Sequence, residues 1–385
     1  MKEGWEIRKL GEIGVVVGGG TPKTNVPSYW GEGFYWITPA ELGGSKYVGA
    51  TARTITDEAL KHTNLTLLPV GTVLLSSRAP IGKVAITTVP MFCNQGFKTI
   101  ICGPDVSNEY VYWFLIHNKD YLVSLGRGAT FKEISKHIVE QVFIPVPPLQ
   151  EQIKIAAELN CLSKIIEKKK QQLVELDRLA HSVFYEMFGD PITNEKGWEM
   201  KKLGDEFGVA SGGTPSTKEN AYWENGTIPW IGSNLCQNEV IYENDGKFIT
   251  EAGFNHSSTR LFRKGFVLVA LVGATIGKVA LIEFDTTTNQ NIAGIDVPAN
   301  KAFTSYFVFY LIQSLYCLFE NIGEGKFKMA NLSFVRSLPL IAPPTDLQEL
   351  FAQRIEAIEK QKELVKQSIM DIETLFNSRM DYWFN

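Results

Sequence analysis

The chain has 385 residues, of which 44% are hydrophobic and 11% aromatic, with a formal net charge of −4. This length exceeds one ordinary domain and suits two or three, each with its own core. Five widely spaced cysteines without a CxxC pair exclude a disulfide framework and a zinc ribbon, and favour a reducing cytosol. The negative charge means that any affinity for nucleic acid must come from local patches or from basic partners.

The first residues, MKEGWEIRKL, carry charges where a signal peptide needs apolar residues. The apolar run 265–282 is long enough to cross a bilayer, but it contains three glycines and Lys278. Its counterpart at 71–86 is polar in the middle. We therefore predict strand–turn–strand segments in both places, no membrane span, and a cytoplasmic protein.

The chain contains its own sequence twice. GWEIRKLGEI (4–13) recurs as GWEMKKLGDE (197–206), and GGTPKT (19–24) recurs as GGTPST (212–217), both at an offset of 193. IGKVA recurs at an offset of 195, and the Pro-Pro pairs 147–148 and 343–344 at 196. An offset that grows by only three residues indicates near-complete duplication with small loop changes.

Each copy has two parts. Residues 1–148 and 189–345 show short β-like runs, glycine turns and a helical pattern near 109–122 or 304–319, which predicts two α/β (α+β) domains, here called heads. Residues 149–188 and 346–385 follow Pro-Pro and read as long helices. The second copy reads PPTDLQE where the first reads PPLQE, so its helix is expected to start differently.

Both helices carry a heptad pattern. Its positions are Ile155, Leu159, Leu162, Ile166, Lys169, Leu173, Leu176, Ala180, Val183 and Met187, and then Phe351, Ile355, Ile358, Lys362, Val365, Ile369, Ile372, Phe376, Arg379 and Trp383. An amphipathic helix on a globular domain is the alternative, but about 33 residues at 1.5 Å each run roughly 50 Å, longer than a small domain's face. Since the first helix leads from head to head, the second can bury its apolar positions against it only by running back. The sequence therefore predicts an antiparallel coiled coil and a pseudo-twofold repeat.

These duplicated elements, in this order, resemble the specificity subunit of type I restriction–modification systems. The resemblance rests on GWE-x3-LG, the GGTP turn, a YW pair leading to WI, the IGKVA and Asn-Gln series, and the Pro-Pro-headed helix, and it covers essentially the whole chain. It implies two target-recognition domains that bind an asymmetric bipartite site in double-stranded DNA. It also implies binding to two modification (methyltransferase) subunits and, in the nuclease form, to restriction (translocase–nuclease) subunits.

Motifs for catalysis and cofactors are missing from the sequence. GATIGKVA (273–280) has three residues between its glycines and valine after its lysine, so it does not fit a phosphate loop. GRGATF (126–131) lacks the third glycine of a dinucleotide fingerprint. The five histidines have no metal-binding spacing, and neither Pro-Pro pair belongs to a methyltransferase motif. We expect a non-catalytic subunit without metal or cofactor.

Comparing the two copies separates shared from divergent residues. Shared residues should serve the fold or phosphate contacts, and divergent ones the reading of bases. Lys83 and Lys278 could be solvated or bind phosphate, and the Asn-Gln pairs could brace a loop or pair with adenine. We expect core positions, and not stacking on DNA bases, for Trp30, Trp36, Trp223 and Trp230.

The divergent stretches are 76–78 against 271–273, 41–46 against 235–239, and 127–132 against 324–328. The residues expected to contact DNA are Thr21, Lys23, Ser76, Ser77, Arg78, Lys83, Asn94, Gln95, Lys98, Arg127, Lys132, Thr214, Ser216, Lys218, Asn234, Thr275, Lys278, Asn289, Gln290, Lys326 and Lys328.

Two other functions are compatible with these features. A non-catalytic two-headed scaffold for a protein or glycan ligand would suit the aromatic heads and the acidic charge. A methyltransferase with built-in specificity would need several hundred further residues. Salt-sensitive DNA binding beside a methyltransferase partner would distinguish the specificity subunit from the scaffold.

Overall fold

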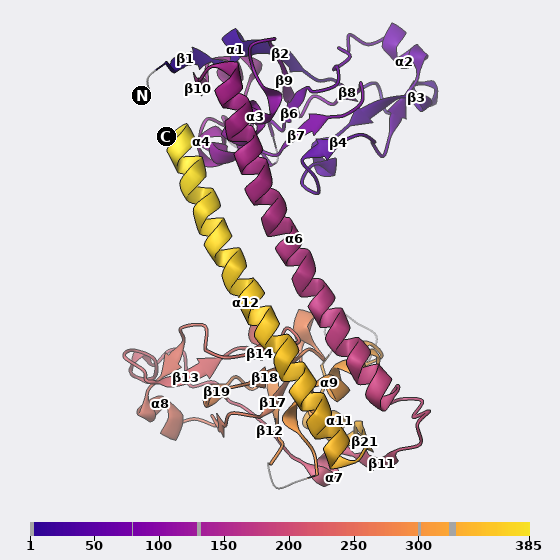
Figure 1. Ribbon diagram of the computed structural model, residues 1–385, viewed down its shortest axis with the longest axis vertical. Helices are drawn as coiled ribbons and strands as arrows, with labels where there is room; N and C mark the ends of the chain where they lie inside the picture. Colours follow the sequence, from indigo (N-terminus) through magenta and orange to yellow (C-terminus); the bar gives the residue numbers. More distant parts are fainter. Residues whose placement is uncertain (1–3, 79, 129–131, 299–301, 323–328) are drawn as a thin grey trace. The chain divides into compact units, whose positions relative to one another are not determined.

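The structure is a computed structural model that describes residues 4–78, 80–128, 132–298, 302–322 and 329–385 (Figure 1). The chain forms two compact units, Met1–Lys169 with Ser368–Asn385, and Lys170–Gln367. Each unit consists of one α/β head and parts of two long helices, α6 (Leu149–Phe188) and α12 (Thr345–Phe384). The predicted duplicated α/β fold is confirmed.

The first head is built around a five-stranded sheet with the order β2-β9-β6-β7-β4. A smaller sheet, β5-β3-β8, and the antiparallel pair β1-β10 complete it. Its elements are β1 (Glu6–Lys9), α1 (Leu10–Ile13), β2 (Gly14–Gly18), η1 (Pro27–Tyr29), β3 (Trp30–Ile37), η2 (Pro39–Glu41), β4 (Tyr47–Val48), β5 (Thr54–Ile55), α2 (Asp57–Lys61), β6 (Val73–Leu75), β7 (Val84–Thr87), β8 (Phe92–Cys93), β9 (Lys98–Cys102), α3 (Asn108–His117), α4 (Lys119–Ser124), α5 (Lys136–Glu140) and β10 (Phe143–Val146).

The second head repeats this topology. Its main sheet has the order β12-β20-β17-β18-β14, beside a sheet β15-β13-β19-β16 and the pair β11-β21. Its elements are β11 (Glu199–Lys202), α7 (Leu203–Glu206), β12 (Gly208–Ser211), η3 (Asn220–Tyr222), β13 (Ile228–Ile231), η4 (Ser233–Leu235), β14 (Glu239–Ile241), β15 (Phe248–Ile249), α8 (Glu251–Asn255), β16 (Leu261–Phe262), β17 (Val267–Ala270), η5 (Gly273–Thr275), β18 (Val279–Ile282), β19 (Thr286–Thr288), β20 (Ile292–Asp296), α9 (Ser305–Ser314), α10 (Tyr316–Glu320), α11 (Leu332–Ser337) and β21 (Pro339–Ala342).

The two apolar runs form antiparallel strand pairs, β6 with β7 and β17 with β18, as predicted. Side chains alternate between the faces of a strand, so a strand that is apolar throughout needs a core on each side. In β17, Val267 and Val269 pack into the core beneath α9, while Leu268 and Ala270 pack into a second core on the other face. Burial on both faces explains why this run has the hydropathy of a membrane segment. No helix within the described part of the chain is long and apolar enough to span a membrane.

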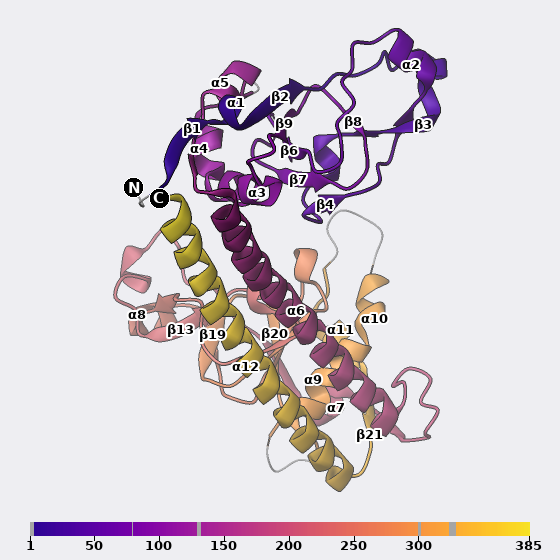
Figure 2. The same ribbon diagram turned by 45° about the horizontal axis from the view of Figure 1, so that its top comes forward.

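The predicted helices near 109–122 and 304–319 are each two helices with a break. Ser107 and Thr304 cap α3 and α9 by accepting hydrogen bonds from Tyr110 N and Phe307 N. Figure 2 shows α3 beside β6 and β7 in the first head.

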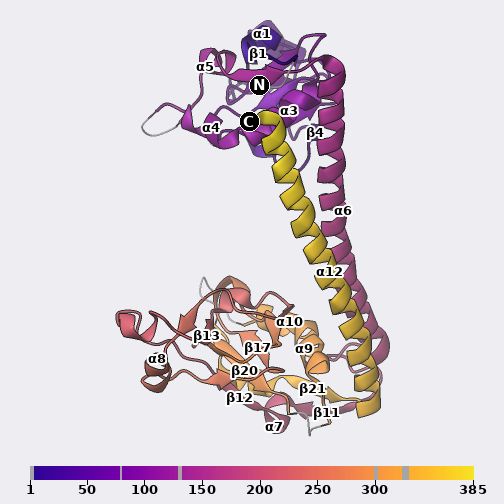
Figure 3. The same ribbon diagram turned by 60° about the vertical axis from the view of Figure 1, so that its left-hand side comes forward.

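Within each unit, the two long helices run antiparallel. In the first unit, the beginning of α6 lies beside the end of α12, where the Arg379 guanidinium pairs with Glu158 (Nη2 to Oε2, 3.0 Å; Figure 3). In the second unit, Phe188 at the end of α6 packs against Phe351 at the beginning of α12, with ring centroids 5.2 Å apart. None of the heptad positions of either helix is exposed.

The second unit buries a charged network at these helices. Lys362 Nζ lies 2.8 Å from Asp177 Oδ1 and 2.9 Å from Glu359 Oε1. The side chains of Lys362 and Glu359 are only 4% and 3% exposed. Burial opposes the charge of Lys362, but the two carboxylates outweigh it and raise its pKa above the ordinary value. The Tyr310 hydroxyl also donates to Glu359 Oε1, at 3.4 Å.

Candidate nucleic-acid interface

Each GGTP turn lies against the loop that carries the Asn-Gln pair. A Cβ built on Gly19 would lie 1.9 Å from the carbonyl oxygen of Asn94, and one on Gly212 would lie 2.6 Å from that of Asn289. Neither glycine has a positive φ. The repeated glycines are therefore required by the close approach of another backbone segment, and not by the conformation of the turn itself.

A pair of tryptophans holds the GGTP turn in each head. In the first head, Trp30 Nε1 donates to Lys23 O at 3.2 Å, and Trp36 Nε1 donates to Gly20 O at 3.0 Å. The second head repeats these bonds from Trp223 to Ser216 (3.1 Å) and from Trp230 to Gly213 (3.2 Å). The rings meet edge to face in both pairs, with centroids 5.0 and 5.2 Å apart. These indoles brace a loop with their N–H groups. Only Trp36 is buried in the core as expected, whereas the other three indoles are half-buried.

A threonine of the GGTP turn reaches the glutamine of the opposite loop. Thr21 Oγ1 donates to Gln95 Oε1 in the first head, and Thr214 Oγ1 donates to Gln290 Oε1 at 2.5 Å in the second. The asparagines act within their own loop: Oδ1 of Asn94 and of Asn289 accepts from the backbone N–H two residues further on, at 2.8 and 3.0 Å. The asparagines thus brace a turn, whereas both glutamines remain exposed.

In the first head, cationic residues gather around Glu133, next to this loop. Lys98 Nζ lies 3.1 Å from Glu133 Oε1 and 3.5 Å from Gln95 O. Arg78 Nη1 lies 3.9 Å from Glu133 Oε2, and Arg127 exchanges two 3.0 Å backbone hydrogen bonds with Glu133. We call Arg78, Lys98, Arg127 and Glu133 the Glu133 cluster.

The second head has apolar residues at the places of Arg78, Lys98 and Glu133. Val272 and Met329 form a backbone β-bridge, as Arg78 and Glu133 do in the first head. Ala293 has the same position in its sheet as Lys98 has in the sheet of the first head. Met329 is 67% exposed. At these positions the first head thus has charged side chains and the second has apolar ones, on one backbone framework.

The hydrogen bonds correct the alignment of this stretch by one residue. Leu271 N donates to Asn291 O as Ser77 N donates to Gly96 O, so Ser77 corresponds to Leu271 and Arg78 to Val272. The loop that follows is one residue longer in the second head. The pairing of 76–78 with 271–273 expected from the sequence is therefore wrong.

Two expected DNA contacts are buried. Ser76 and Ser77 are 0% exposed; Ser76 Oγ donates to Pro80 O at 2.7 Å, and Ser77 Oγ accepts from Lys98 Nζ at 3.3 Å. Both hydroxyls support the loop that carries Arg78, so we do not retain them as contacts.

The shared lysines are also occupied. Lys83 Nζ donates to the carbonyl oxygens of Leu42 (2.7 Å) and Pro39 (3.3 Å), and Lys278 Nζ donates to Gln237 Oε1 at 2.7 Å. Each lysine ties the turn after a glycine to the loop that follows β3 or β13. This placement favours a structural role over a phosphate contact.

The remaining expected contacts lie mostly at the surface. Lys23, Lys132, Ser216, Lys218 and Asn234 are exposed, and Thr275 is half-buried, with its hydroxyl 3.5 Å from Val272 O. Lys326 and Lys328 lie outside the described residues.

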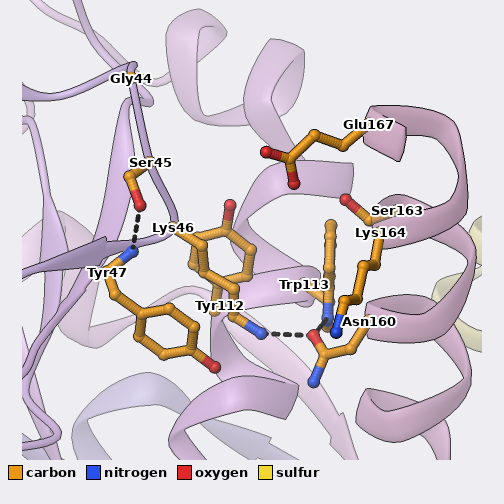
Figure 4. Close-up of a pocket in the computed structure, with 10 residues that line it drawn as sticks. All are labelled: Gly44, Ser45, Lys46, Tyr47, Tyr112, Trp113, Asn160, Ser163, Lys164 and Glu167. Atoms are coloured by element: carbon orange, nitrogen blue, oxygen red, sulfur yellow. Dashed lines mark hydrogen bonds between the residues drawn. The ribbon is translucent and has the colours of Figure 1, made fainter. Parts of the chain in front are cut away.

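A pocket of about 510 Å³ separates the edge of the first head from α6 (Figure 4). Lys46 closes one side of it, with Nζ 4.9 Å from the ring centroid of Tyr112 and 5.1 Å from that of Trp113, and bonded to Asn160 and Glu109. Burial lowers the pKa of Lys46.

The carboxylate that faces Lys46 is also strongly held. Burial opposes the ionisation of Glu109, but hydrogen bonds from Tyr47, Asn160 and Lys46 outweigh it and keep its pKa below the usual value. Burial, together with Glu109, raises the pKa of Tyr47 to about 12. Lys46 therefore joins the head to its helix, and it is poorly placed to read bases.

Sequence reasoning missed a buried glutamine at the start of each long helix. Gln152 accepts from Ser107 N (2.9 Å) and donates to the carbonyls of Asp105 and Pro147. Gln348 accepts from Thr304 N (3.2 Å) and donates to the carbonyls of Ala302 and Pro343. The expectation of different helix starts is wrong, because both helices begin directly after Pro-Pro. The common offset of 196 between the glutamines was the available signal.

The comparisons with known proteins agree with this framework. The family profile described as "Type I restriction modification DNA specificity domain" matches residues 2–177 and again residues 195–374. The chain belongs to this family.

One relative within the specificity family covers most of the chain, and another covers about half of it. The MjaIX type I restriction enzyme specificity subunit of Methanocaldococcus jannaschii is 32% identical over 378 residues, which span 92% of this chain and 86% of that protein. The EcoR124I/EcoR124II specificity subunit of Escherichia coli is 29% identical over 192 residues, 47% of each chain.

Two solved structures share the fold. The type I restriction–modification S subunit from M. genitalium aligns with a TM-score of 0.60 at 15% identity, over 99% of this chain and 96% of that one. A chain from a study of assembly and conformational transition in the type I system aligns with a TM-score of 0.62 at 16% identity, over 99% and 97%. Among the residues that the structure describes, no three His, Cys, Asp or Glu side chains form a metal-binding group.

Proposed function

We propose that the chain is the DNA-recognising subunit of a type I restriction–modification complex, and that its heads, 1–148 and 189–345, each read one half of an asymmetric bipartite target. The observation that carries this is the contrast around Glu133. One framework of GGTP turn, tryptophan pair and Asn-Gln loop carries the partly exposed Arg78 and the largely buried Lys98 in the first head, but Val272 and the buried Ala293 in the second. Such a pair suits two half-sites of different sequence.

Arg78 is the residue we assign to base reading in the first head. Arginine recognises guanine through two hydrogen bonds in the major groove, which discriminates against the wrong base by about 1–3 kcal/mol. Valine cannot make these bonds but can contact a thymine methyl group. The first half-site should therefore contain a guanine at the position that Arg78 reads, and Val272 should read its own position by shape and apolar contact.

The test is Arg78→Val, which gives the first head the residue of the second. The variant, assembled with its modification subunits, should methylate a target with relaxed sequence at one position of one half-site, as read by methylome sequencing. Lys61→Ala, an exposed change in the same head, is the matched control and should leave the target unchanged. An active Arg78→Val complex with an unaltered target would contradict the assignment.

Exchange of a whole head tests the division of the target. Replacing residues 1–148 by the head of a related specificity subunit should change one half-site and leave the other intact. A folded and assembled chimaera that altered both halves, or neither, would refute independent reading. Loss of salt-sensitive DNA binding in every form of the complex would instead favour the scaffold for a non-DNA ligand.

The same proposal includes the partners. The two-fold duplication suits two copies of one modification subunit, and restriction subunits would join in the nuclease form. Both long helices offer exposed apolar side chains away from their heptad positions, which would suit docking of the modification subunits. They include Ile165, Val174 and Leu179 on α6, and Leu364, Leu375 and Tyr382 on α12.

The chain itself would supply no chemistry and no cofactor. It would act in the cytoplasm, which suits its five free cysteines.

A further inference from the structure

One arginine of the first head has a pre-arranged and unused guanidinium group. Arg53 lies just before β5, and its side chain is exposed. Its Cζ atom lies 3.5 Å from the ring centroid of Trp30 and 5.7 Å from that of Trp36. Within the described part of the chain, this guanidinium has no hydrogen-bond or ion-pair partner. Stacking on an indole fixes the plane of a guanidinium while leaving its N–H donors available.

The backbone holds Arg53 beside the GGTP turn. Its carbonyl oxygen accepts from Trp36 N at 3.2 Å and from Thr51 Oγ1 at 2.6 Å. Trp30 and Trp36 are the same indoles that bond to the turn, through Lys23 and Gly20. The cation therefore sits on the pair of rings that also positions the exposed Thr21 side chain.

The second head carries a cation in the same register. Trp230 N donates to Lys247 O at 3.0 Å, as Trp36 N donates to Arg53 O. Lys247 is exposed, and its Nζ lies 3.4 Å from Asp245 Oδ2. Arg78, Lys98 and Glu133, in contrast, have apolar counterparts in the second head. A cationic residue at this backbone position is thus common to both heads, whereas the cations beside the Asn-Gln loop, Arg78 and Lys98, are not.

We propose that Arg53 and Lys247 each bind a phosphate of the DNA backbone, and that they anchor their heads against the duplex whatever its sequence. The inference rests on the proposed DNA-binding function and assigns two contacts within it. Planar guanidinium groups bind phosphate through paired hydrogen bonds, and lysine binds it as a point charge. A contact present in both heads cannot distinguish the half-sites, so it suits the sequence-neutral backbone.

The test measures the salt dependence of binding to a labelled duplex of scrambled sequence, for which the target need not be known. The complex of the full chain with its modification subunits is titrated over a range of potassium chloride concentrations. Each phosphate contact contributes about 0.9 to the slope of log affinity against log salt. Arg53→Ala and Lys247→Ala should each reduce the slope by about that amount and weaken binding several-fold. The double variant should reduce it by about twice as much.

Two control variants separate the contact from general effects. Arg53→Lys keeps the charge, so it should keep the slope while losing some affinity. Lys61→Ala removes an exposed lysine of the same head that pairs with Glu58 (3.3 Å), and it should change neither quantity. Thermal melts of the variants should match the wild type, since both cations are exposed.

Two results would overturn the assignment. One is an unchanged salt slope in both alanine variants. The other is a loss of affinity for the sequence that the complex methylates without a loss for the scrambled duplex. Such a result would show that these residues contact bases and not phosphates. A wild-type complex that bound no duplex at low salt would instead refute the proposed function itself.

Discussion

Substitution of Lys362 by methionine tests whether the buried network stabilises the second unit. The change removes the cation 2.9 Å from Glu359 and leaves that carboxylate only 3% exposed. Breaking a buried ion pair by removing one partner costs about 3–5 kcal/mol, because the other charge stays buried without compensation. Adding Glu359→Gln removes this charge and keeps a partner for the Tyr310 hydroxyl. The double variant should therefore be more stable than Lys362→Met alone, although it carries one more change.

Hydrogen-exchange mass spectrometry at increasing urea concentrations measures the stability of each unit separately. Peptides from the first part of α12 should lose protection in Lys362→Met and regain much of it in the double variant. Peptides from the first head serve as an internal reference. Lys360→Met, on the exposed side of the same helix, is the matched control and should change the unfolding free energy by less than about 0.5 kcal/mol. Equal losses in the single and the double variant would refute the reasoning.

The pH dependence follows from the raised pKa of Lys362. A group with a raised folded-state pKa contributes stability below its ordinary value, here 10.5, and loses it as the pH rises through the folded value. The difference in stability between wild type and Lys362→Met should therefore be full at neutral pH and shrink above pH 10.5. A difference that stayed constant into strong alkali would contradict this account.

Three further predictions concern the helices and the chemistry. Gln152→Leu and Gln348→Leu each leave a part-buried backbone N–H without its acceptor, that of Ser107 before α3 or that of Thr304 before α9. Each should therefore cost about 1–3 kcal/mol locally, seen as faster exchange of that amide; unchanged exchange would show that the glutamines are dispensable. One heptad inserted after Lys169 and another after Gln367 add about 10 Å to each helix, or about three base pairs, so methylome sequencing should show a longer gap between unchanged half-sites. An active insertion variant with its original gap would assign the spacing to the heads. Finally, the purified chain, given S-adenosylmethionine, ATP, magnesium and DNA, should show no turnover, and activity that followed the chain through purification would contradict a non-catalytic role.

The sequence predicted the features that depend on periodicity. The heptad positions could be predicted from the spacing of apolar residues alone. The strand pairs around IGKVA could be predicted because one copy is apolar almost throughout, whereas the other is polar in the middle. The close backbone approach at Gly19 could not be seen in this way, because it depends on a loop 75 residues away along the chain.

The candidate site was less predictable. The one-residue insertion after Val272 hid the true partners of Ser77 and Arg78, which only the hydrogen bonds reveal. Lys46 belongs to a divergent stretch expected to read bases, but it is bonded to Asn160 of α6, which lies far from it in the sequence. Arg53 was missed because nothing in the sequence shows that Trp30 lies beneath its guanidinium.

The pairing of β1 with β10 has a consequence for how such proteins can evolve. Glu6 faces Val146 across this ladder, and Glu199 faces Ala342 in the second copy, so each head begins and ends at one point. Both heads also open with nearly the same residues, GWEIRKLG and GWEMKKLG. A genetic crossover within that opening, paired with one at the Pro-Pro codons, would transfer a closed module and leave the long helices untouched. New specificities could then arise by recombination between existing genes, without passing through a misfolded intermediate.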